Sequence, residues 1–259
     1  MTNILQEIYQ HKIVEVRNRK KILSLTDICQ KLKADSCKKI PNPKYDFYQT
    51  LKKKNDAHQL GLICEIKRGS PSAGILQADL DVAKTAKAYE NYGASCISVL
   101  TDEKYFFSQL DYLLEARKSC DLPILRKDFM VDPYQIYESK MMQADCILLI
   151  VAMLSDNQLK ELEEVAISLN LSVLIEVHNL DELQRAMQLK SKLIGINNRD
   201  LKTLKIDLNT TLKLQPYVPK DAVLVCESGI KSMADLENFR QNNIHCFLIG
   251  EYFMRGGKI

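Results

Sequence analysis

Lysine, carboxylate, amide and guanidinium side chains repeatedly stand at the ends of short apolar runs in this chain. The residues at these positions are Glu65, Lys67, Lys127, Glu176, Asn197, Arg199 and Glu227. Glu65 and Lys67 are two residues apart, so their side chains would share one face of a strand. Lysines and carboxylates in a confined, partly desolvated pocket shift one another's pKa values and supply general acids and bases. Each charge taken singly is more simply a solvated loop charge or a structural ion pair, but their recurrence indicates an enzyme site.

Two glycine-containing segments follow the last two apolar runs. One contains Ser228 and Gly229, and the other contains Gly250 and Glu251. Glycine lets the backbone approach a ligand closely, and backbone N–H groups at helix starts attract anions. A plain turn would explain either glycine alone, but the pair predicts a phosphate site in these loops.

The apolar runs alternate with helical segments. Eight runs predict strands, at 62–67, 96–101, 123–127, 146–152, 172–177, 193–197, 223–227 and 246–250. Helical segments lie between them at 82–92, 109–119, 133–143, 157–169, 180–190 and 232–241, and a shorter link covers 207–214. Strict alternation of this kind is typical of a closed barrel. We predict an α/β fold, a (β/α)8 TIM barrel, whose strand carboxyl ends bring the charged residues to one mouth.

The first part of the chain has a different pattern. An irregular apolar stripe over residues 4–16 predicts a helix, and the break at Ser24 begins a second one. The segment Pro41-Asn42-Pro43 forces extended chain. No linker divides the later repeats, so we predict one domain over residues 1–259, with 1–58 as a helical N-terminal extension. Only residues 251–259 follow the last apolar run, so the final helix is expected to be short.

Composition excludes several classes of protein. The 259 residues carry 36 basic and 33 acidic side chains, and this balance does not give the basic surface that nucleic-acid binding requires. None of the eight cysteines forms a C-x-x-C pair or has histidine at zinc spacing, so we expect no metal site. Five lie inside apolar runs, where a thiol acts as a small hydrophobe: Cys64, Cys96, Cys146, Cys226 and Cys246.

The chain shows no sign of export or membrane insertion. Its amino terminus alternates charged and apolar residues without the apolar core of a signal peptide, and no stretch approaches the length of a membrane span. We therefore expect a cytoplasmic protein, and we also expect a monomer. Its expected partner is a small phosphorylated molecule, because such an anion needs only a few local positive charges.

Segments in order along nearly the whole chain resemble the indole-3-glycerol phosphate synthase family. They include EIKRGSPSAG at 65–74, SVLT at 98–101, PILRKDF at 123–129, LLIVA at 148–152, LIEVH at 174–178, IGINNRDL at 194–201, ESGI at 227–230 and LIGE at 248–251. Tyr105-Phe106, Lys12 with Glu15-Val16, and Asp46-Phe47 also resemble the family. The chain departs from the family pattern at Ser108-Gln109, where Gly-Ser is usual.

The resemblance implies an enzyme of tryptophan biosynthesis that acts on 1-(2-carboxyphenylamino)-1-deoxyribulose 5-phosphate without metal or organic cofactor. In this reaction a ring carbon attacks the sugar ketone, and carbon dioxide and water then leave an indole. Lys127 is the expected acid for the ketone oxygen, and Glu176 is the expected base. Lys67 would pair with a substrate anion, and Glu65 would support as an acid or by positioning. Asn197, counted as catalytic, would hold sugar hydroxyls and carboxylates together with Arg199.

The resemblance also implies a set of substrate-binding residues. Phe106 would pack on the anthranilate ring, although a lone aromatic side chain is more often simple core. Ser228, Gly229, Gly250 and the Glu251 amide would bind the phosphate. The remaining predicted binding residues are Ser70, Pro71 and Glu227. His178 is the one histidine near the mouth, and we interpret it as a bystander.

Three other functions fit the sequence less well. Phosphoribosylanthranilate isomerase would need a cysteine at the mouth of the first strand and an aspartate at the sixth. Here Cys64 is out of phase with Glu65, and the sixth strand offers Asn197. A non-catalytic phosphate-binding barrel would be expected to lack a key lysine or glutamate. A nucleic-acid module built on the basic residues 17–21 would require a strongly salt-dependent affinity.

Overall fold

A closed barrel of parallel strands forms the centre of the structure, a computed structural model that describes residues 4–36, 45–71, 73–201 and 203–257. The strands are hydrogen-bonded in the order β1-β10-β9-β8-β7-β6-β5-β4. Their bounds are β1 Gly61–Ile66, β4 Cys96–Leu100, β5 Ile124–Lys127, β6 Cys146–Ile150, β7 Ser172–Val177, β8 Leu193–Asn197, β9 Val223–Glu227 and β10 Cys246–Ile249. The predicted (β/α)8 barrel is confirmed. Pro41-Asn42-Pro43, predicted to be extended, lies outside the described residues.

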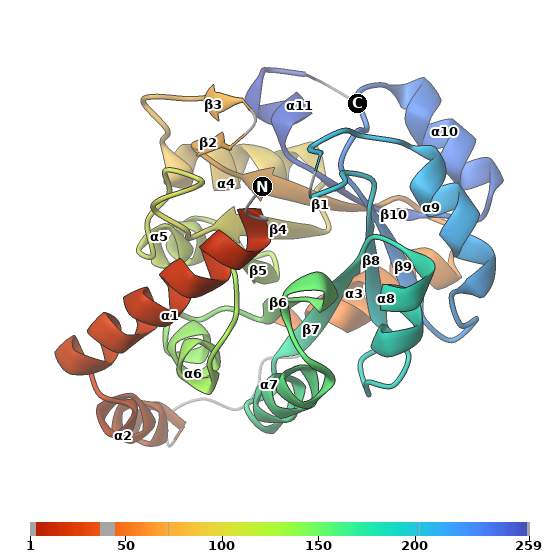
Figure 1. Ribbon diagram of the computed structural model, residues 1–259. Helices are drawn as coiled ribbons and strands as arrows, with labels where there is room; N and C mark the ends of the chain where they lie inside the picture. Colours follow the sequence, from red (N-terminus) through yellow and green to blue (C-terminus); the bar gives the residue numbers. More distant parts are fainter. Residues whose placement is uncertain (1–3, 37–44, 72, 202, 258–259) are drawn as a thin grey trace.

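Helices surround the barrel (Figure 1). Their bounds are α4 Val82–Tyr92, α5 Tyr112–Ser119, α6 Pro133–Met141, α7 Asp156–Ser168, α8 Leu180–Ala186, α9 Asn209–Leu214, α10 Met233–Gln241 and α11 Glu251–Met254. Many begin at a side chain that accepts a hydrogen bond from the first turn, which is a favourable N-cap. These caps are Asp81, Asp132, Ser155, Asn179 and Ser232. They fix where each helix starts after the loop that leaves the barrel mouth.

The described part of the N-terminal extension contains the helices α1 Ile4–Ile22, α2 Leu25–Ser36 and α3 Phe47–Asp56. Helix α3 contacts β1, β4, β7, β9 and β10 and closes the amino end of the barrel. Its Phe47 and Leu51 side chains are fully buried there. Helix α1 reaches the carboxyl end, where Ile4, Leu5 and Ile8 form part of a cavity wall. The extension therefore covers one end of the barrel and borders the other.

Successive side chains of each strand point alternately into one of two apolar layers. One lies inside the barrel and includes Leu125 and Leu174, while the other lies between the strands and the helices and includes Ile97 and Ile175. The five cysteines of the apolar runs are buried in these layers. Cys64 belongs to the outer layer, so it points away from Glu65 as the strand phase predicted.

The structure differs from the expected elements mainly in the loops. The helix expected over 109–119 begins only at Tyr112, after a loop in which Asp102 accepts hydrogen bonds from the Tyr105 and Phe106 amides. The strand expected to reach residue 152 ends at Ile150 and continues as the 3-10 helix η2 Val151–Met153. The pattern also missed the short antiparallel pair β2 Gly69–Ser70 and β3 Gly74–Ile75, and the 3-10 helix η3 Gln215–Tyr217. The last helix is short, as expected.

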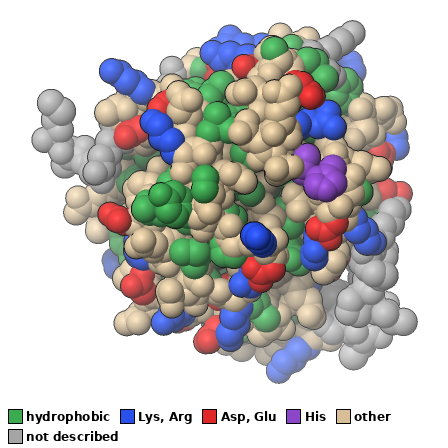
Figure 2. Space-filling model, turned by 90° about the vertical axis from the view of Figure 1, so that its right-hand side faces the viewer, with side chains coloured by type: hydrophobic (Ala, Val, Ile, Leu, Met, Phe, Trp, Pro, Cys, Tyr) green, Lys and Arg blue, Asp and Glu red, His purple; other side chains and the backbone are tan. Residues whose placement is uncertain are grey.

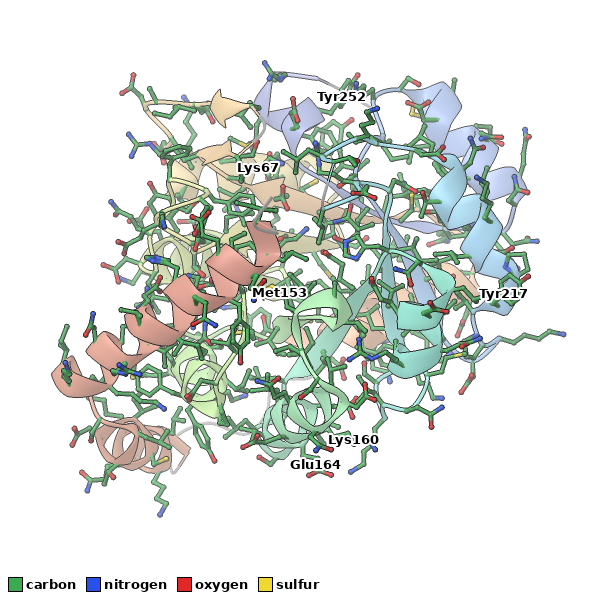
Figure 3. The ribbon with its side chains drawn as sticks, in the orientation of Figure 1. Lys67, Met153, Lys160, Glu164, Tyr217 and Tyr252 are labelled. Carbon is green, nitrogen blue, oxygen red and sulfur yellow. The ribbon has the colours of Figure 1, made fainter. Side chains whose placement is uncertain are left out.

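Surface charge is mixed on the face shown in Figure 2, where acidic and basic side chains are interspersed. Side chains of both signs also project from the outer helices, and Figure 3 shows Lys160 and Glu164 on α7, far from Lys67. Among the described helices, none is both long and apolar enough to cross a bilayer.

Candidate active site

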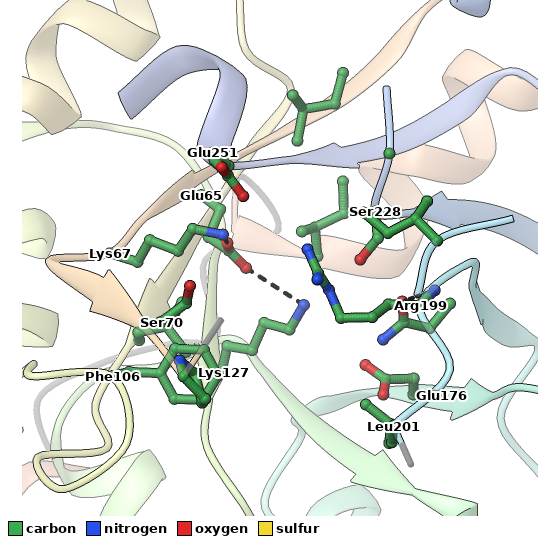
Figure 4. Close-up of a pocket in the computed structure, with 18 of the residues that line it drawn as sticks. Glu65, Lys67, Ser70, Phe106, Lys127, Glu176, Arg199, Leu201, Ser228 and Glu251 are labelled. Atoms are coloured by element: carbon green, nitrogen blue, oxygen red, sulfur yellow. Dashed lines mark hydrogen bonds and ion pairs between the residues drawn. The ribbon is translucent and has the colours of Figure 1, made fainter. Parts of the chain in front are cut away.

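A cavity of about 550 Å³ opens at the carboxyl ends of the strands. It is lined by every predicted site residue except one, namely by Glu65, Lys67, Ser70, Pro71, Phe106, Lys127, Glu176, Asn197, Arg199, Ser228, Gly229, Gly250 and Glu251. Figure 4 shows side chains from both sides of the barrel directed into this space. The exception is Glu227, which is fully buried beneath the cavity and contacts Lys127.

Lys127 lies at the centre of a charged group formed with Glu65, Lys67 and Glu227. Its Nζ atom lies 2.9 Å from Glu227 Oε2 and 3.3 Å from Glu65 Oε2, and Lys67 Nζ lies 2.7 Å from Glu65 Oε1. Burial would lower the pKa of Lys127, but the surrounding carboxylates of Glu227, Glu65 and Glu176 outweigh burial and hold the pKa above its ordinary value. The lysine is therefore a charged ammonium donor that faces the cavity.

The two carboxylates that hold Lys127 differ in their protonation. Burial would raise the pKa of Glu65, but Lys67 and Lys127 outweigh burial and lower the pKa to about 2. For Glu227, burial raises the pKa to about 7, and the ion pair with Lys127 offsets only part of that effect. Glu65 is consequently a permanent carboxylate, whereas Glu227 titrates near neutral pH.

Gly250 provides the space that Glu65 occupies. A Cβ atom at this position would lie 2.2 Å from Glu65 Oε1 and 3.0 Å from Glu65 Cβ. Any larger residue would therefore push the carboxylate away from its two lysine partners. Gly250 was predicted only as a phosphate contact, and its second role depends on a distance that the sequence does not show.

Glu176 lies across the cavity from Lys67, at the end of β7 (Figure 4). Its Oε1 atom is 3.3 Å from His178 Nε2. Burial would raise the pKa of Glu176, but hydrogen bonding and charge from His178 outweigh it, with help from Lys127 and Asn197, so the pKa is lowered. Glu176 is thus an ionised carboxylate, the form that a general base requires.

The loop after β8 holds the remaining polar groups. Asn197 Oδ1 accepts a hydrogen bond from the Arg199 amide at 3.0 Å, and the Arg199 guanidinium donates to the Leu204 carbonyl at 3.1 Å. Arg199 and Ile206 also form an isolated antiparallel bridge. These contacts fix the loop so that Arg199 borders the cavity beside Ser228 (Figure 4).

The two predicted phosphate loops, which contain Ser228-Gly229 and Gly250-Glu251, meet at one rim of the cavity. Ser228 and Gly229 adopt left-handed backbone conformations, with φ of 65° and 93°. Ser70 comes to the same cavity from β2. Sequence reasoning missed two cations among the lining residues, Lys231 and Arg255. Neither stood at the end of an apolar run, so the pattern that found the other charges could not find them.

An aromatic and aliphatic wall completes the cavity. The Phe106 ring lies 6.0 Å from the Phe129 ring, centroid to centroid. Asp102 fixes the loop that carries Phe106, and the Ser108 amide donates to the Asp102 carbonyl at 3.0 Å. The departure from the family pattern at Ser108-Gln109 therefore lies in an ordered turn.

A buried ion network ties α1 to this wall, and sequence reasoning did not assign it. Lys12 Nζ lies 2.8 Å from both Asp102 Oδ2 and Asp128 Oδ1, and all three side chains are fully buried. Arg126 contacts the other Asp128 oxygen at 3.1 Å. Asp128 directly follows Lys127, so the network links the N-terminal helix to the central lysine. The only sequence signal was the resemblance around Lys12 and Glu15.

Comparisons with known proteins identify the family of this chain. The family model described as indole-3-glycerol phosphate synthase matches residues 5–258. Relatives named indole-3-glycerol phosphate synthase from Polynucleobacter asymbioticus and Azospirillum brasilense are each 48% identical over 255 residues, which cover 98% of this chain and 95% of each relative. The solved tryptophan synthase subunit alpha from Legionella pneumophila shares the fold alone, with a TM-score of 0.56 and 14% identity over 81% of this chain and 87% of that one. The chain belongs to the indole-3-glycerol phosphate synthase family.

Proposed function

We propose that this chain converts 1-(2-carboxyphenylamino)-1-deoxyribulose 5-phosphate to indole-3-glycerol phosphate, carbon dioxide and water. The observation that carries the proposal is the placement of Lys127 between Glu65 and Glu227, in the same cavity as the ionised Glu176. A charged acid and a charged base thus face one space that is large enough for a substrate of this size.

Ring closure requires an acid at the ketone oxygen. As the ring carbon attacks the ketone, negative charge develops on oxygen, and Lys127 donates a proton to it. Glu65 and Glu227 hold the ammonium group in place, so the proton donor is already positioned before the reaction begins. Glu65, with its pKa of about 2, has no proton to give at neutral pH and acts by positioning the two lysines.

The later steps require a base and a second proton. Loss of carbon dioxide leaves a hydroxyl on the new ring, and departure of this hydroxyl as water needs a proton donor. Lys67, which pairs with Glu65 and lines the cavity, donates this proton. Before this step Lys67 also pairs with a substrate anion. Glu176 accepts the proton that the ring releases when the indole becomes aromatic.

The cavity walls supply complementary binding groups. The Phe106 face packs on the anthranilate ring, while Asn197 and Arg199 contact the sugar hydroxyls and the carboxylate. The phosphate binds at the rim where backbone and hydroxyl groups of the two glycine loops lie. The rim residues are Ser70, Ser228, Gly229, Gly250 and Glu251, with Lys231 and Arg255 as nearby cations.

The test is a fluorescence assay for the indole product with the purified protein and the carboxyphenylamino sugar phosphate. We expect turnover without added metal or organic cofactor. Failure to form indole, together with isomerisation of phosphoribosylanthranilate, would replace the proposal with the isomerase alternative. Tight phosphate binding with neither activity would support a non-catalytic barrel.

We also propose that the protein acts as a monomer in the cytoplasm. Free thiols at the described cysteines support a reducing compartment. Sedimentation velocity tests the oligomeric state, and fractionation of the source cells tests the location. A dimer, or recovery outside the cytoplasm, would contradict the corresponding part.

A further inference from the structure

A carboxylate–imidazole–carboxylate chain lies directly behind the proposed base. His178 follows Glu176 by two residues, so both side chains leave the strand end on the same side. His178 Nε2 lies 3.3 Å from Glu176 Oε1, and His178 Nδ1 lies 2.9 Å from Glu182 Oε2. His178 Nε2 is buried, and apart from its ion pair with Glu176 it has no hydrogen-bond partner among the described residues.

The outer carboxylate is itself held rigidly. Glu182 lies in the first turn of α8, and its Oε2 atom also accepts a hydrogen bond from the His178 amide at 2.9 Å. Its Oε1 atom accepts a hydrogen bond from the Asn179 side chain at 2.7 Å, and its amide donates to Asn179 Oδ1 at 2.9 Å. The helix start thus fixes Glu182, and Glu182 fixes the plane of the imidazole ring.

We propose that His178, held by Glu182, is a positioning residue that orients the Glu176 carboxylate toward the substrate and keeps it ionised. His178 is not among the residues that line the cavity, so it acts through Glu176 and does not touch the substrate. The inference rests on the proposed role of Glu176 as the base. It replaces the interpretation of His178 as a bystander.

The surrounding charges favour this role. Burial would lower the pKa of His178, but Glu176 and Glu182 outweigh burial and raise it to about 10, so the ring is an imidazolium at neutral pH. Glu176 also faces Lys127 from β5, Asn197 from β8 and Glu227 from β9. Lys127 has two direct carboxylate partners, Glu65 and Glu227, and among the described residues His178 is the cation in direct contact with Glu176.

The direction of a pH effect follows from this contact. An adjacent positive charge favours the ionised form of a carboxylate, so removing the imidazolium raises the pKa of Glu176. Activity that requires ionised Glu176 then declines at a higher pH than in the parent enzyme. A residue that only filled space would lower stability without moving this limb of the profile.

The experiment compares kcat/KM against pH for the parent, His178→Phe, His178→Gln, Glu182→Gln and His245→Phe. His245 is a matched control, because it is a buried histidine outside the cavity lining, next to the start of β10, and its ring packs edge-on against the ring of His58. We expect the acidic limb of His178→Phe to move up by about one pH unit, with about tenfold lower kcat/KM on that limb. Ionisations of the substrate are common to all variants and cancel in the comparison.

The other variants separate charge from shape. His178→Gln keeps a neutral donor, so we expect it to recover part of kcat while its acidic limb stays shifted. Glu182→Gln keeps the imidazolium charge but frees the ring, so we expect kcat to fall while the acidic limb does not move up, and His245→Phe should leave both unchanged. If His178→Phe does not fold, as judged by circular dichroism, the Gln variants decide the question.

Two outcomes would overturn the inference. One is an acidic limb that stays in place in folded His178 variants, and the other is an equal shift in His245→Phe. Absence of indole product from the parent enzyme would instead remove the proposed function itself. The two failures are therefore distinguishable in the same series of measurements.

Discussion

The Lys127 ammonium group lies 2.9 Å from Glu227 Oε2, and no part of the Glu227 side chain reaches solvent. The lysine is thus both the donor that faces the cavity and the counter-ion of a buried acid. Glu227 can become neutral by taking up a proton, since burial already raises its pKa to about 7. This relationship allows the function of Lys127 to be removed without leaving a buried negative charge.

Replacing Lys127 with alanine should therefore abolish most of the activity and preserve the fold. We expect kcat to fall by about 10²- to 10⁴-fold, the usual contribution of a positioned acid. Circular dichroism should remain that of the parent. Lys160→Ala is the matched control, because Lys160 is exposed on α7 (Figure 3), and it should retain full activity. Near-normal turnover of Lys127→Ala would remove Lys127 from the mechanism.

Glu176→Gln keeps the size of the side chain and removes its basicity. We expect kcat to fall by about 10²- to 10⁴-fold, with a much smaller change in KM, because the substrate contacts remain. Glu164→Gln on the exposed face of α7 provides the control for loss of one negative charge. The roles proposed above would be wrong if Glu176→Gln turned over normally in the indole fluorescence assay.

The sequence predicted the barrel because strand period and helix period differ, and eight alternations of the two admit few topologies. It also predicted which charges share the mouth, since side-chain direction in a strand is set by parity, as Glu65 and Lys67 illustrate. Cys64 confirms the same rule from the opposite face. These predictions needed only local geometry.

The remaining features depend on how deeply a side chain lies below the barrel mouth and on where the N-terminal helices pack against the barrel. Local sequence patterns contain neither kind of information. Parity placed Glu227 at the mouth but could not show that it lies beneath Lys127 and outside the cavity wall. Likewise, the apolar stripe of α1 predicted a helix but not which part of the barrel it would meet. The buried position of Lys12 follows from that docking, so it became visible only in the structure.

Gly250→Ala tests whether close packing holds Glu65. The added Cβ would lie 2.2 Å from Glu65 Oε1, so the carboxylate must leave its ion pairs with Lys67 and Lys127. We expect kcat to fall by about tenfold or more, as is usual when catalytic groups are displaced by about an ångström. A double-mutant cycle with Glu65→Ala gives the control. If the clash with Glu65 is the cause, Gly250→Ala should have little further effect in that background. Equal effects in both backgrounds would point to the backbone instead.

Lys12→Met tests the ion network that holds α1 against the barrel. Removing the ammonium group leaves the buried Asp102 and Asp128 without their shared partner, so we expect the free energy of unfolding to fall by about 3–5 kcal/mol at neutral pH. Lys20→Met, on the same helix, removes a partly exposed ion pair with Asp132 at 2.8 Å. That control should change stability by less than about 1 kcal/mol.

The pH dependence of this difference has a defined sign. Burial would raise the pKa of Asp128, but Lys12 and Arg126 outweigh it and hold the pKa well below its ordinary value. A carboxylate whose pKa is depressed in the folded state stabilises the fold at pH values above its unfolded pKa of about 4, and this contribution is lost as the pH falls.

Lys12 has the opposite pH dependence. Burial would lower the Lys12 pKa, but Asp128, Asp102 and Glu15 raise it, so its contribution is complete throughout the neutral range and is lost only at strongly alkaline pH. Urea unfolding of the parent and Lys12→Met should therefore differ most between about pH 6 and 9, and the difference should shrink progressively as the pH falls below about 4. A difference independent of pH would mean that Lys12 stabilises α1 by packing and not by charge.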